Sequence, residues 1–143
     1  MRKSAITAEA AAALIFDGAS VMIGGFLGVG APVRLIDALI ARGARGLTII
    51  GNDTAYPTVG VGRMIEAGCV ACVRASHIGT NPTTQRLMSD GAIDVELIPQ
   101  GTLAERIRAG GAGLALQLRI FMNSESLAHH DSSWERGDGG RFD

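Results

Sequence analysis

The sequence has few aromatic residues, few cysteines and almost no net charge, and each shortage excludes a class of function. Of its 143 residues only 4% are aromatic, too few for a surface that stacks nucleic acid bases. The 13 basic and 14 acidic side chains give a net charge of −1, without the basic excess of nucleic acid-binding proteins. Two cysteines cannot form a disulfide framework. We therefore expect a cytoplasmic protein that binds no nucleic acid.

Long hydrophobic runs are also missing. The longest uncharged stretch, Ala19–Val33, is too short to span a bilayer and contains several glycines and a proline, so we expect no membrane partner. The hydrophobic fraction of 47% and the charged fraction of 19% exclude disorder as the main state. Glycine is abundant, at 20 residues, which is typical of an α/β protein with many tight loops.

Short β-rich runs alternate with helical patterns along the chain. The predicted strands are Ser20–Ile23, Leu47–Ile50, Val70–Arg74 and Val95–Ile98. Between and after them we predict helices at Ala8–Phe16, at Pro32–Arg42, near Gly62–Ala67, from Asn81 to Gly91 and from Gly101 to Gly111. This alternation predicts an α/β fold with a mainly parallel sheet and helices on its faces.

Small or polar residues follow each predicted strand. The four segments are Gly24–Pro32, Gly51–Thr54, Ser76–Asn81 and Pro99–Thr102. The carboxyl ends of parallel strands share one edge of a sheet, where ligands bind in such folds. We therefore predict that the four segments lie at one edge and form a ligand site.

The glycine loop Gly24–Pro32 is the strongest of these signals. Glycines let a ligand approach the backbone closely, and Pro32 starts a helix whose free N–H groups attract phosphate, carboxylate or an oxyanion. The loop matches neither the P-loop nor the dinucleotide fingerprint, because it lacks the lysine of the first and the third glycine of the second. The alternative interpretation is a tight strand-to-helix turn that binds nothing.

Other candidate residues favour structural roles. We expect Cys69 and Cys72 to be small buried hydrophobes rather than a redox or zinc pair, because an offset of three on a strand places them on opposite faces. We interpret Ser76-His77 as organising its loop rather than as a nucleophile and its base. The pair Asn52-Asp53 either positions a substrate or caps the following turn.

The chemistry of a metal site or a nucleophile is also missing from the pattern. His129-His130-Asp131 lies in a polar segment without a further ligand, so we predict no metal. The acidic residues Glu66, Glu96 and Glu105 occupy ordinary helix or strand positions, and no pair of carboxylates is placed for acid–base catalysis.

The segment Asp17–Pro32 resembles the signature of the alpha subunit of family I coenzyme A (CoA) transferases. It reads Asp-Gly, two residues, three apolar residues, Gly-Gly-Phe, three residues, Gly, one residue and Pro. Similar stretches follow at Asn52–Thr54, Ser76–Asn81 and Pro99–Leu114, so the resemblance covers about residues 5–114. The acetate/acetoacetate and 3-oxoacid CoA-transferases are the most similar in pattern. The fold implied is a three-layer α/β/α domain.

The resemblance also implies a reaction and a partner. The family moves CoA from an acyl-CoA to a carboxylic acid, here a short-chain or 3-oxo acid of the kind used in fatty acid and ketone body metabolism. A glutamate of the beta subunit, in a Ser-Glu-Asn-Gly context, attacks the thioester, and Ser124-Glu125-Ser126 is only a superficial echo of it. The resemblance thus implies a hetero-oligomer with no catalytic residue in this chain and no tightly bound cofactor, since CoA is a substrate.

The resemblance also assigns site residues by position. The CoA-binding and oxyanion residues are Gly24, Gly25, Phe26, Leu27, Gly28, Val29 and Gly30. The substrate-site loops contain Asn52, Asp53, Ser76, His77, Gln100 and Gly101.

The sequence departs from the family after Leu114. Alpha subunits continue with a Gly-Gly-Phe-x-Thr-Pro-Thr-Gly type of stretch, which Ala115–Arg119 replaces here. We expect residues 1–114 to form the first part of an alpha-subunit domain and residues 115–143 a disordered tail, as in a truncated or frameshifted form. The alternatives are an inactive remnant of that subunit and an unrelated α/β domain that binds a phosphate ligand.

A truncated domain has a consequence for solubility. Missing strands leave a sheet edge unpaired and an apolar face uncovered, so we predict poor solubility or partial folding, and no transferase activity, when the chain is expressed alone. Thermal unfolding followed by circular dichroism tests this, and a sharp cooperative transition of the isolated monomer would contradict it.

Overall fold

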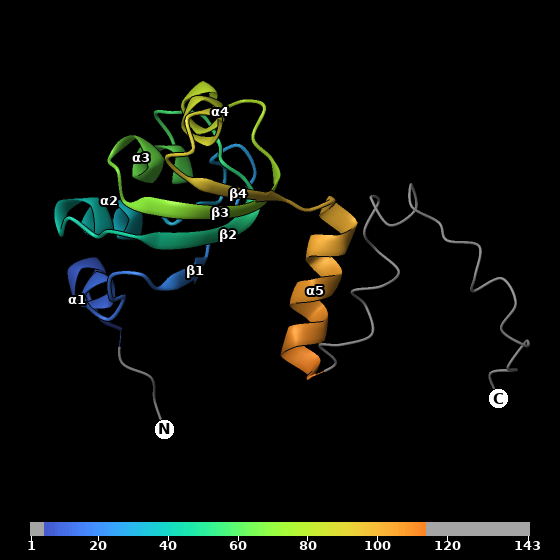
Figure 1. The fold of residues 1–143 in the computed structure, drawn as a ribbon. Helices are drawn as coiled ribbons and strands as arrows, with labels where there is room; N and C mark the ends of the chain where they lie inside the picture. Colours follow the sequence, from blue (N-terminus) through green and yellow to red (C-terminus); the bar gives the residue numbers. More distant parts are fainter. Residues whose placement is uncertain (1–4, 114–143) are drawn as a thin grey trace, which may run out of the picture.

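The computed structural model describes residues 5–113, which form one parallel sheet flanked by helices (Figure 1). The strands are hydrogen-bonded in the order β1-β2-β3-β4. Their bounds are β1 Ser20–Met22, β2 Leu47–Asp53, β3 Val70–His77 and β4 Asp94–Leu97. The helices of this part are α1 Ala8–Ala13, α2 Val33–Ala41, α3 Val61–Glu66, α4 Pro82–Ser89 and α5 Gln100–Ala112. The predicted α/β class with a parallel sheet is confirmed.

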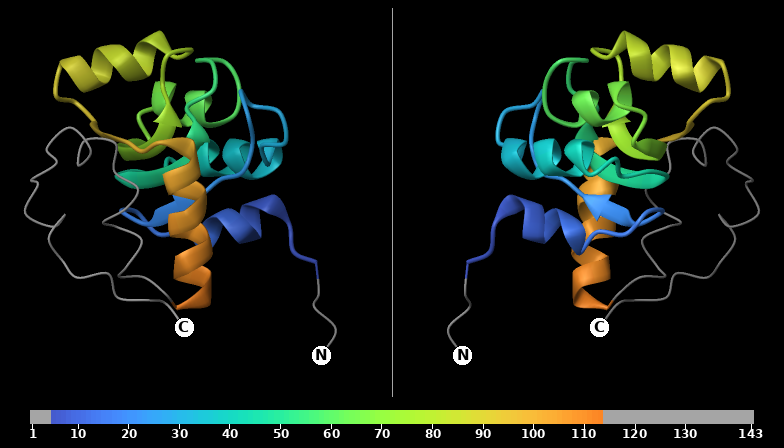
Figure 2. Two further views of the ribbon diagram at one scale, coloured as in Figure 1. Left: turned by 90° about the vertical axis from the view of Figure 1, so that its right-hand side faces the viewer. Right: turned by 90° about the vertical axis from the view of Figure 1, so that its left-hand side faces the viewer.

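The helices divide unequally between the two faces of the sheet. Helices α1 to α4 lie on the face that carries the hydrophobic core, whereas α5 stands apart from them and runs across the strands (Figures 1 and 2). A groove between α5 and the sheet is lined by Met22, Ile50, Arg74 and Glu96, one residue from each strand in a single register row. The sheet is therefore the middle of three layers, and α5 alone supplies the third layer within the described residues.

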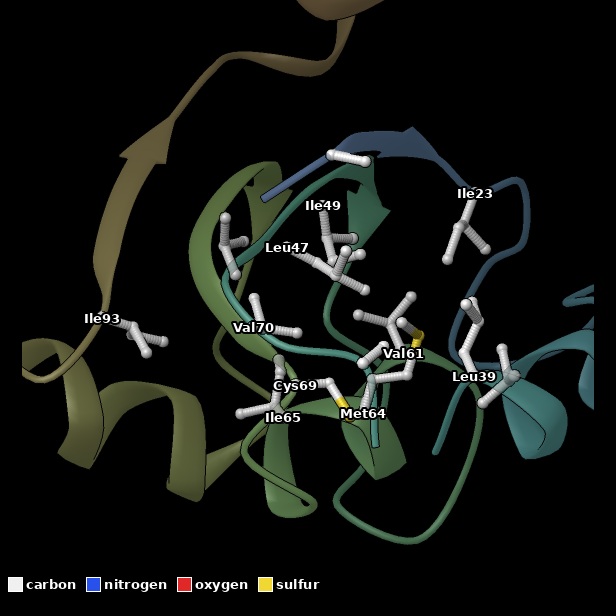
Figure 3. Packing of buried hydrophobic residues seen from close by; sticks show 14 of the residues in the cluster. Ile23, Leu39, Leu47, Ile49, Val61, Met64, Ile65, Cys69, Val70 and Ile93 are labelled. Atoms are coloured by element: carbon white, nitrogen blue, oxygen red, sulfur yellow. The ribbon is translucent and has the colours of Figure 1, made fainter. Parts of the chain in front are cut away.

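The core follows from the alternation of side chains along the strands. In β2, Leu47 and Ile49 are buried. Thr48 and Ile50, which alternate with them along the strand, are half-buried on the opposite face. The buried residues of the strands pack against the apolar faces of α2 and α3 (Figure 3), and the cluster also includes Ile36, Leu39, Val61, Met64 and Val73. The alternation of side chains along β2 therefore determines which face of the sheet carries the core.

Local capping rules position the helix ends. Thr7 accepts a hydrogen bond from the Ala10 N–H and begins α1, and Asn81 accepts one from the Thr84 N–H and begins α4, with Pro82 in the first turn. Gly43, with φ of 71°, ends α2 in the left-handed conformation that glycine adopts most easily. Threonine, asparagine and glycine are among the residue types favoured at these helix ends.

Three helix predictions were wrong at their ends. The first helix ends at Ala13 rather than Phe16, and Leu14 and Phe16 are 74% and 72% exposed. The chain turns there toward β1, so these side chains leave the helix face that Ala12 buries. Helix α2 starts after Pro32 and leaves Val33 exposed. Helix α5 continues through Gly110 and Gly111 and ends at Gly113, where φ is 72°.

Two predictions fall outside the described residues. The tail from residue 115 onward, with Ser124-Glu125-Ser126 and His129-His130-Asp131, belongs to that part of the chain. Within residues 5–113 no helix combines the length and the apolar character that a membrane crossing requires.

The core can be tested at α2. We predict that Leu39→Ala lowers the hydrogen-exchange protection of β2 and β3 amides by about 2–5 kcal/mol, because Leu39 has no exposed surface and its loss leaves a cavity. The control is Leu14→Ala, at an exposed leucine, which should change protection by less than about 0.5 kcal/mol. Equal effects of the two substitutions would contradict this core.

Candidate functional site

The glycine loop between β1 and α2 contains a tight turn. The Phe26 N–H donates to the Val29 carbonyl at 3.0 Å, and the Val29 N–H donates back to the Phe26 carbonyl at 2.9 Å. The two central residues have positive φ, 50° at Leu27 and 88° at Gly28, as a type I′ turn requires. Leu27 is thus a non-glycine residue in a conformation that L-amino acids rarely adopt.

A buried carboxylate holds this turn against the sheet. Asp53, the last residue of β2, is 6% exposed. Its two oxygens accept the Leu27 N–H at 3.2 and 3.0 Å, the Ala55 N–H at 2.8 Å and an Asn52 side-chain N–H at 2.9 Å. Because hydrogen bonds to an ionised group are among the stronger ones in proteins, this carboxylate fixes the loop to the carboxyl edge of the sheet.

The segment between β2 and α3 supports the turn from the other side. A methyl group added at Gly28 would lie 2.9 Å from the Val59 Cγ2 atom, closer than carbon atoms approach. A methyl group added at Gly60, where φ is 52°, would lie 3.1 Å from the Gly28 Cα atom. Glycine at these two positions therefore allows the two segments to pack backbone against backbone.

The turn leaves a particular set of backbone N–H groups unengaged. Those of Phe26, Leu27 and Val29 donate within the protein. Those of Gly24, Gly25, Gly28 and Gly30 have no acceptor among residues 5–113. Of the seven loop residues predicted to bind an oxyanion or CoA, the four glycines are thus the ones with a free donor.

The side chains of the turn face solvent. Phe26 is 63% exposed and Val29 is 78% exposed, so neither contributes to the core. Tyr56 and Val59, in the supporting segment, are also exposed hydrophobic residues. The loop therefore presents apolar side chains beside its unengaged amides.

The next predicted site residues lie on strands rather than in loops. Strand β2 continues to Asp53 and β3 continues to His77, so Asn52, Ser76 and His77 belong to the ladder. The propensities of Asn, Asp and Ser favour turns, but the parallel pairing of Asp53 with His77 prevails. These residues do lie at the same carboxyl edge as the glycine loop.

Ser76 and His77 do not form a pair. Successive side chains of a strand point to opposite faces, and Ser76 is half-buried whereas His77 is exposed. The His77 ring lies over Gly79, where an added methyl group would meet its Cε1 atom at 2.7 Å. The Ser76 Oγ is buried and has no hydrogen-bond partner among the described residues.

Gln100 and Gly101 lie at the far side of the sheet from the glycine loop. They form the first turn of α5, after β4, and both are exposed. Strand β4 is three strand spacings from β1, about 14 Å. The described residues therefore do not bring these two positions against the glycine loop.

The two cysteines occupy opposite faces of the sheet. Cys69 is buried in the core, whereas Cys72 is half-buried on the other face, where its Sγ donates to an Asp94 oxygen at 3.6 Å. Burial raises the pKa of the Cys69 thiol, and burial together with the Asp94 carboxylate raises the pKa of the Cys72 thiol. The expectation of buried hydrophobes thus holds for Cys69 only, and both thiols are protonated near neutral pH. In the described ranges, no three His, Cys, Asp or Glu side chains are grouped to hold a metal ion.

The carboxylates of the described part are engaged elsewhere or saturated. Glu96 pairs with Arg74 at 3.3 Å and with Arg106 at 2.9 Å, which ties α5 to the sheet. Glu66 accepts from the Thr83 hydroxyl, and Glu105 pairs with Arg108 at 2.6 Å. Asp53 is the carboxylate at the glycine loop, and its oxygens already accept three donors. Residues 5–113 therefore place no free carboxylate nucleophile beside the loop.

Sequence reasoning missed the supports of the loop. Val59 and Gly60 were not singled out, and Asp53 was considered only as a substrate-positioning or capping residue. Gly60 could have been singled out as a glycine directly before a helical pattern. Its contact with Gly28 could not have been predicted, because the two residues are distant in the sequence.

Known proteins share this sequence and this fold. The sequence profile of the Coenzyme A transferase family matches residues 5–117. An acetate CoA-transferase subunit alpha of Escherichia coli is 52% identical over 114 residues, which are 80% of this chain and 52% of that protein. The alpha subunit of an acetoacetyl-CoA:acetate/butyrate CoA transferase of Clostridium acetobutylicum is 52% identical over 98 residues, 68% of this chain and 45% of that protein.

Solved structures of acyl-CoA transferases have a similar fold. The thioester complex of an acyl-CoA transferase from Escherichia coli O157:H7 with CoA superposes with a TM-score of 0.64 at 26% identity, over 75% of this chain and 22% of that one. The chain spans about half the length of the curated relatives it matches.

The packing at the loop can be tested with a double-mutant cycle. We predict that Gly28→Ala destabilises the protein more than Gly43→Ala, because both residues have positive φ but only Gly28 faces Val59, whereas Gly43 faces open space. Val59→Ala should recover part of the Gly28→Ala loss, with a coupling energy of about 0.5–3 kcal/mol. The measurement is the hydrogen-exchange protection of the β2 amides, which does not need two-state unfolding of the whole chain, in the four variants of the cycle and in the Gly43→Ala control. Equal effects of the two glycine substitutions, with no coupling, would contradict this packing.

Proposed function

This chain belongs to the coenzyme A transferase family, and we propose that its glycine loop holds the reacting thioester during CoA transfer. The substrates proposed are an acyl-CoA and a short-chain carboxylic or 3-oxo acid, as the names of the relatives suggest. The chain would act as part of an alpha subunit, together with a beta subunit that supplies the glutamate nucleophile.

One observation carries this proposal. The N–H groups of Gly24, Gly25, Gly28 and Gly30 have no acceptor among the described residues, in a loop that contacts Asp53 and Val59 at the carboxyl edge of the sheet. Preorganised amide donors of this kind stabilise the oxyanion of a tetrahedral intermediate, and loss of one donor typically raises the barrier by about 3–4 kcal/mol. The loop therefore suits acyl chemistry at a thioester carbonyl.

The proposed reaction consists of acyl exchanges at one glutamate. The beta-subunit carboxylate attacks the thioester carbonyl, whose oxygen becomes an oxyanion that accepts hydrogen bonds from the glycine amides. The C–S bond breaks, which leaves an acyl-glutamyl anhydride and the CoA thiolate. The thiolate then attacks the glutamyl carbonyl, forms a glutamyl-CoA thioester and releases the first acid. An acceptor carboxylate attacks the carbonyl of this thioester, and the C–S bond breaks, which leaves a new anhydride and the CoA thiolate. The thiolate then attacks the acyl carbonyl of the new anhydride and displaces the glutamate carboxylate. The new acyl-CoA and the free glutamate result.

The residues beside the loop suit this chemistry. Backbone amides donate hydrogen bonds without introducing an acid that could protonate the attacking carboxylate. The exposed side chains of Phe26 and Val29 would help to exclude water, which would otherwise hydrolyse the anhydride. Among residues 5–113 the carboxylate at the loop, Asp53, is already hydrogen-bonded, which supports the proposal that a partner chain supplies the nucleophile. We further propose that CoA acts as a substrate rather than as a tightly bound cofactor.

Two other functions stay open as alternatives. The chain is an inactive remnant if it cannot assemble with a beta subunit. It is an unrelated phosphate-ligand domain if the same loop binds a nucleotide or a sugar phosphate and not CoA.

The proposal is tested by co-expressing the chain with the beta subunit of a related acetate CoA-transferase and adding acetyl-CoA. We predict that intact mass spectrometry detects a CoA adduct on the beta subunit, because the thiolate displaces acetate from the anhydride. The same beta subunit without this chain, and a variant with its glutamate replaced by glutamine, should carry no adduct.

The outcome also separates the alternatives. Absence of the adduct in a stable complex would contradict the proposal and favour the remnant. A thermal shift with NAD or a sugar phosphate but none with CoA would favour the unrelated domain.

A further inference from the structure

We propose that Asp53 is a positioning residue that sets the catalytic geometry of the glycine loop without touching the substrate. This inference rests on the proposed function of the loop, and it assigns a role to a carboxylate that the reaction itself does not use.

The position of Asp53 follows from the pleat of β2. Buried and half-buried residues alternate from Leu47 to Asp53, so the Asp53 side chain points to the core face rather than to the edge where a ligand would lie. The residue is nearly fully buried, yet its carboxylate has donors on both oxygens. A buried carboxylate is retained only where hydrogen bonds satisfy it, and here the donors are protein N–H groups.

The contact with Leu27 opposes a backbone strain. Leu27 has φ of 50°, a conformation that a leucine avoids because its Cβ approaches the following carbonyl. The Leu27 N–H donates to both Asp53 oxygens, at 3.0 and 3.2 Å, although the two residues are 26 positions apart. Without this charge-assisted contact, the turn would lose the interaction that compensates the left-handed Leu27.

The same contact orients a free amide. The Gly28 N–H belongs to the peptide unit that follows Leu27, and the Leu27 backbone is fixed at its N–H by Asp53. The mutual hydrogen bonds of Phe26 and Val29 fix the two ends of the turn. The direction of the Gly28 N–H, one of the proposed oxyanion donors, is therefore set by the Asp53 carboxylate together with the mutual hydrogen bonds of Phe26 and Val29.

A direct catalytic role for Asp53 does not fit this geometry. Its oxygens accept from Leu27, Ala55 and Asn52, and the side chain is withdrawn from solvent. A carboxylate so engaged is neither a free base nor a free nucleophile. Asp53 therefore acts through the loop backbone, and its loss should lower the turnover number more than it weakens substrate binding.

The first test needs no activity. In the full chain, we expect Asp53→Asn to speed the hydrogen exchange of the Leu27 amide at least about tenfold, because an Asn side chain has only one acceptor oxygen for three donors. The matched control is Asp17→Asn. Asp17 also accepts a backbone N–H, that of Arg45 at 3.1 Å, but it is exposed and contacts the α2–β2 connection. This control should leave Leu27 exchange unchanged, and unchanged exchange of β3 amides in both variants verifies that the fold persists.

The second test measures transfer in the complex with a beta subunit. A displacement of the donor by about 1 Å is enough to slow turnover about 100-fold, so we expect Asp53→Asn to lower kcat by that order with KM for acyl-CoA changed less than about threefold. Asp17→Asn should retain the wild-type kcat. Asp53→Ala, which has no acceptor, should be slower than Asp53→Asn.

The outcomes distinguish this inference from the proposed function. Unchanged Leu27 exchange in Asp53→Asn overturns the inference whatever the activity, and so does faster exchange with an unchanged kcat. A wild-type complex that transfers no CoA overturns the proposed function, whereas the exchange data then still decide whether Asp53 holds the loop.

Discussion

The hydrogen bond between the Asp53 carboxylate and the Leu27 N–H joins the two parts of the molecule on which the proposed chemistry depends. One part is the parallel sheet, whose alternating side chains fix the direction of Asp53. The other is the glycine loop, whose turn contains a leucine in a left-handed conformation. Because the Asp53 carboxylate belongs to the sheet and accepts the Leu27 N–H of the loop, the sheet fixes the position of the turn. Four glycine amides are then left without an acceptor among the described residues at the edge where α/β sheets bind ligands.

Within the described residues, the glycine loop offers free backbone N–H donors but no free carboxylate. Acidic side chains of the described part pair with arginines, accept from hydroxyl or amide groups, or lie away from the loop, as in the pairing of Glu96 with Arg74 and Arg106. A loop that offers only amides can stabilise an oxyanion but cannot form a covalent intermediate. This division fits the proposal that another chain supplies the nucleophile.

Much of the fold could be predicted from the sequence because its determinants are local. Thr7, Asn81 and Gly43 mark helix ends by hydrogen bonds or φ values that involve neighbouring residues. The glycine loop was also predicted, since a motif of sixteen consecutive residues carries it. The strand ends were not, because the pairing of Asp53 with His77 depends on a neighbouring strand and overrides the turn preference of the residues.

The contacts that shape the site could not be predicted for the same reason. Two contacts form between segments that are distant in the sequence, namely Leu27 with Asp53 and Gly28 with Val59. No local sequence pattern predicts which backbone N–H a carboxylate will accept. The exposure of Leu14 and Phe16 could not be predicted from local pattern either, since it depends on where the chain turns to enter β1. Gln100 stays a predicted substrate-site residue, since it follows β4 at the carboxyl edge of the sheet, three strand spacings from β1.

The central claim is that glycine amides of this loop hold the oxygen of a thioester. A crystal structure of the chain with a beta subunit and an unreactive acyl-CoA analogue measures this directly. The account predicts that the analogue's carbonyl oxygen lies about 2.7–3.1 Å from at least one of the Gly24, Gly25, Gly28 or Gly30 nitrogens. An analogue bound with that oxygen remote from all four nitrogens would contradict it.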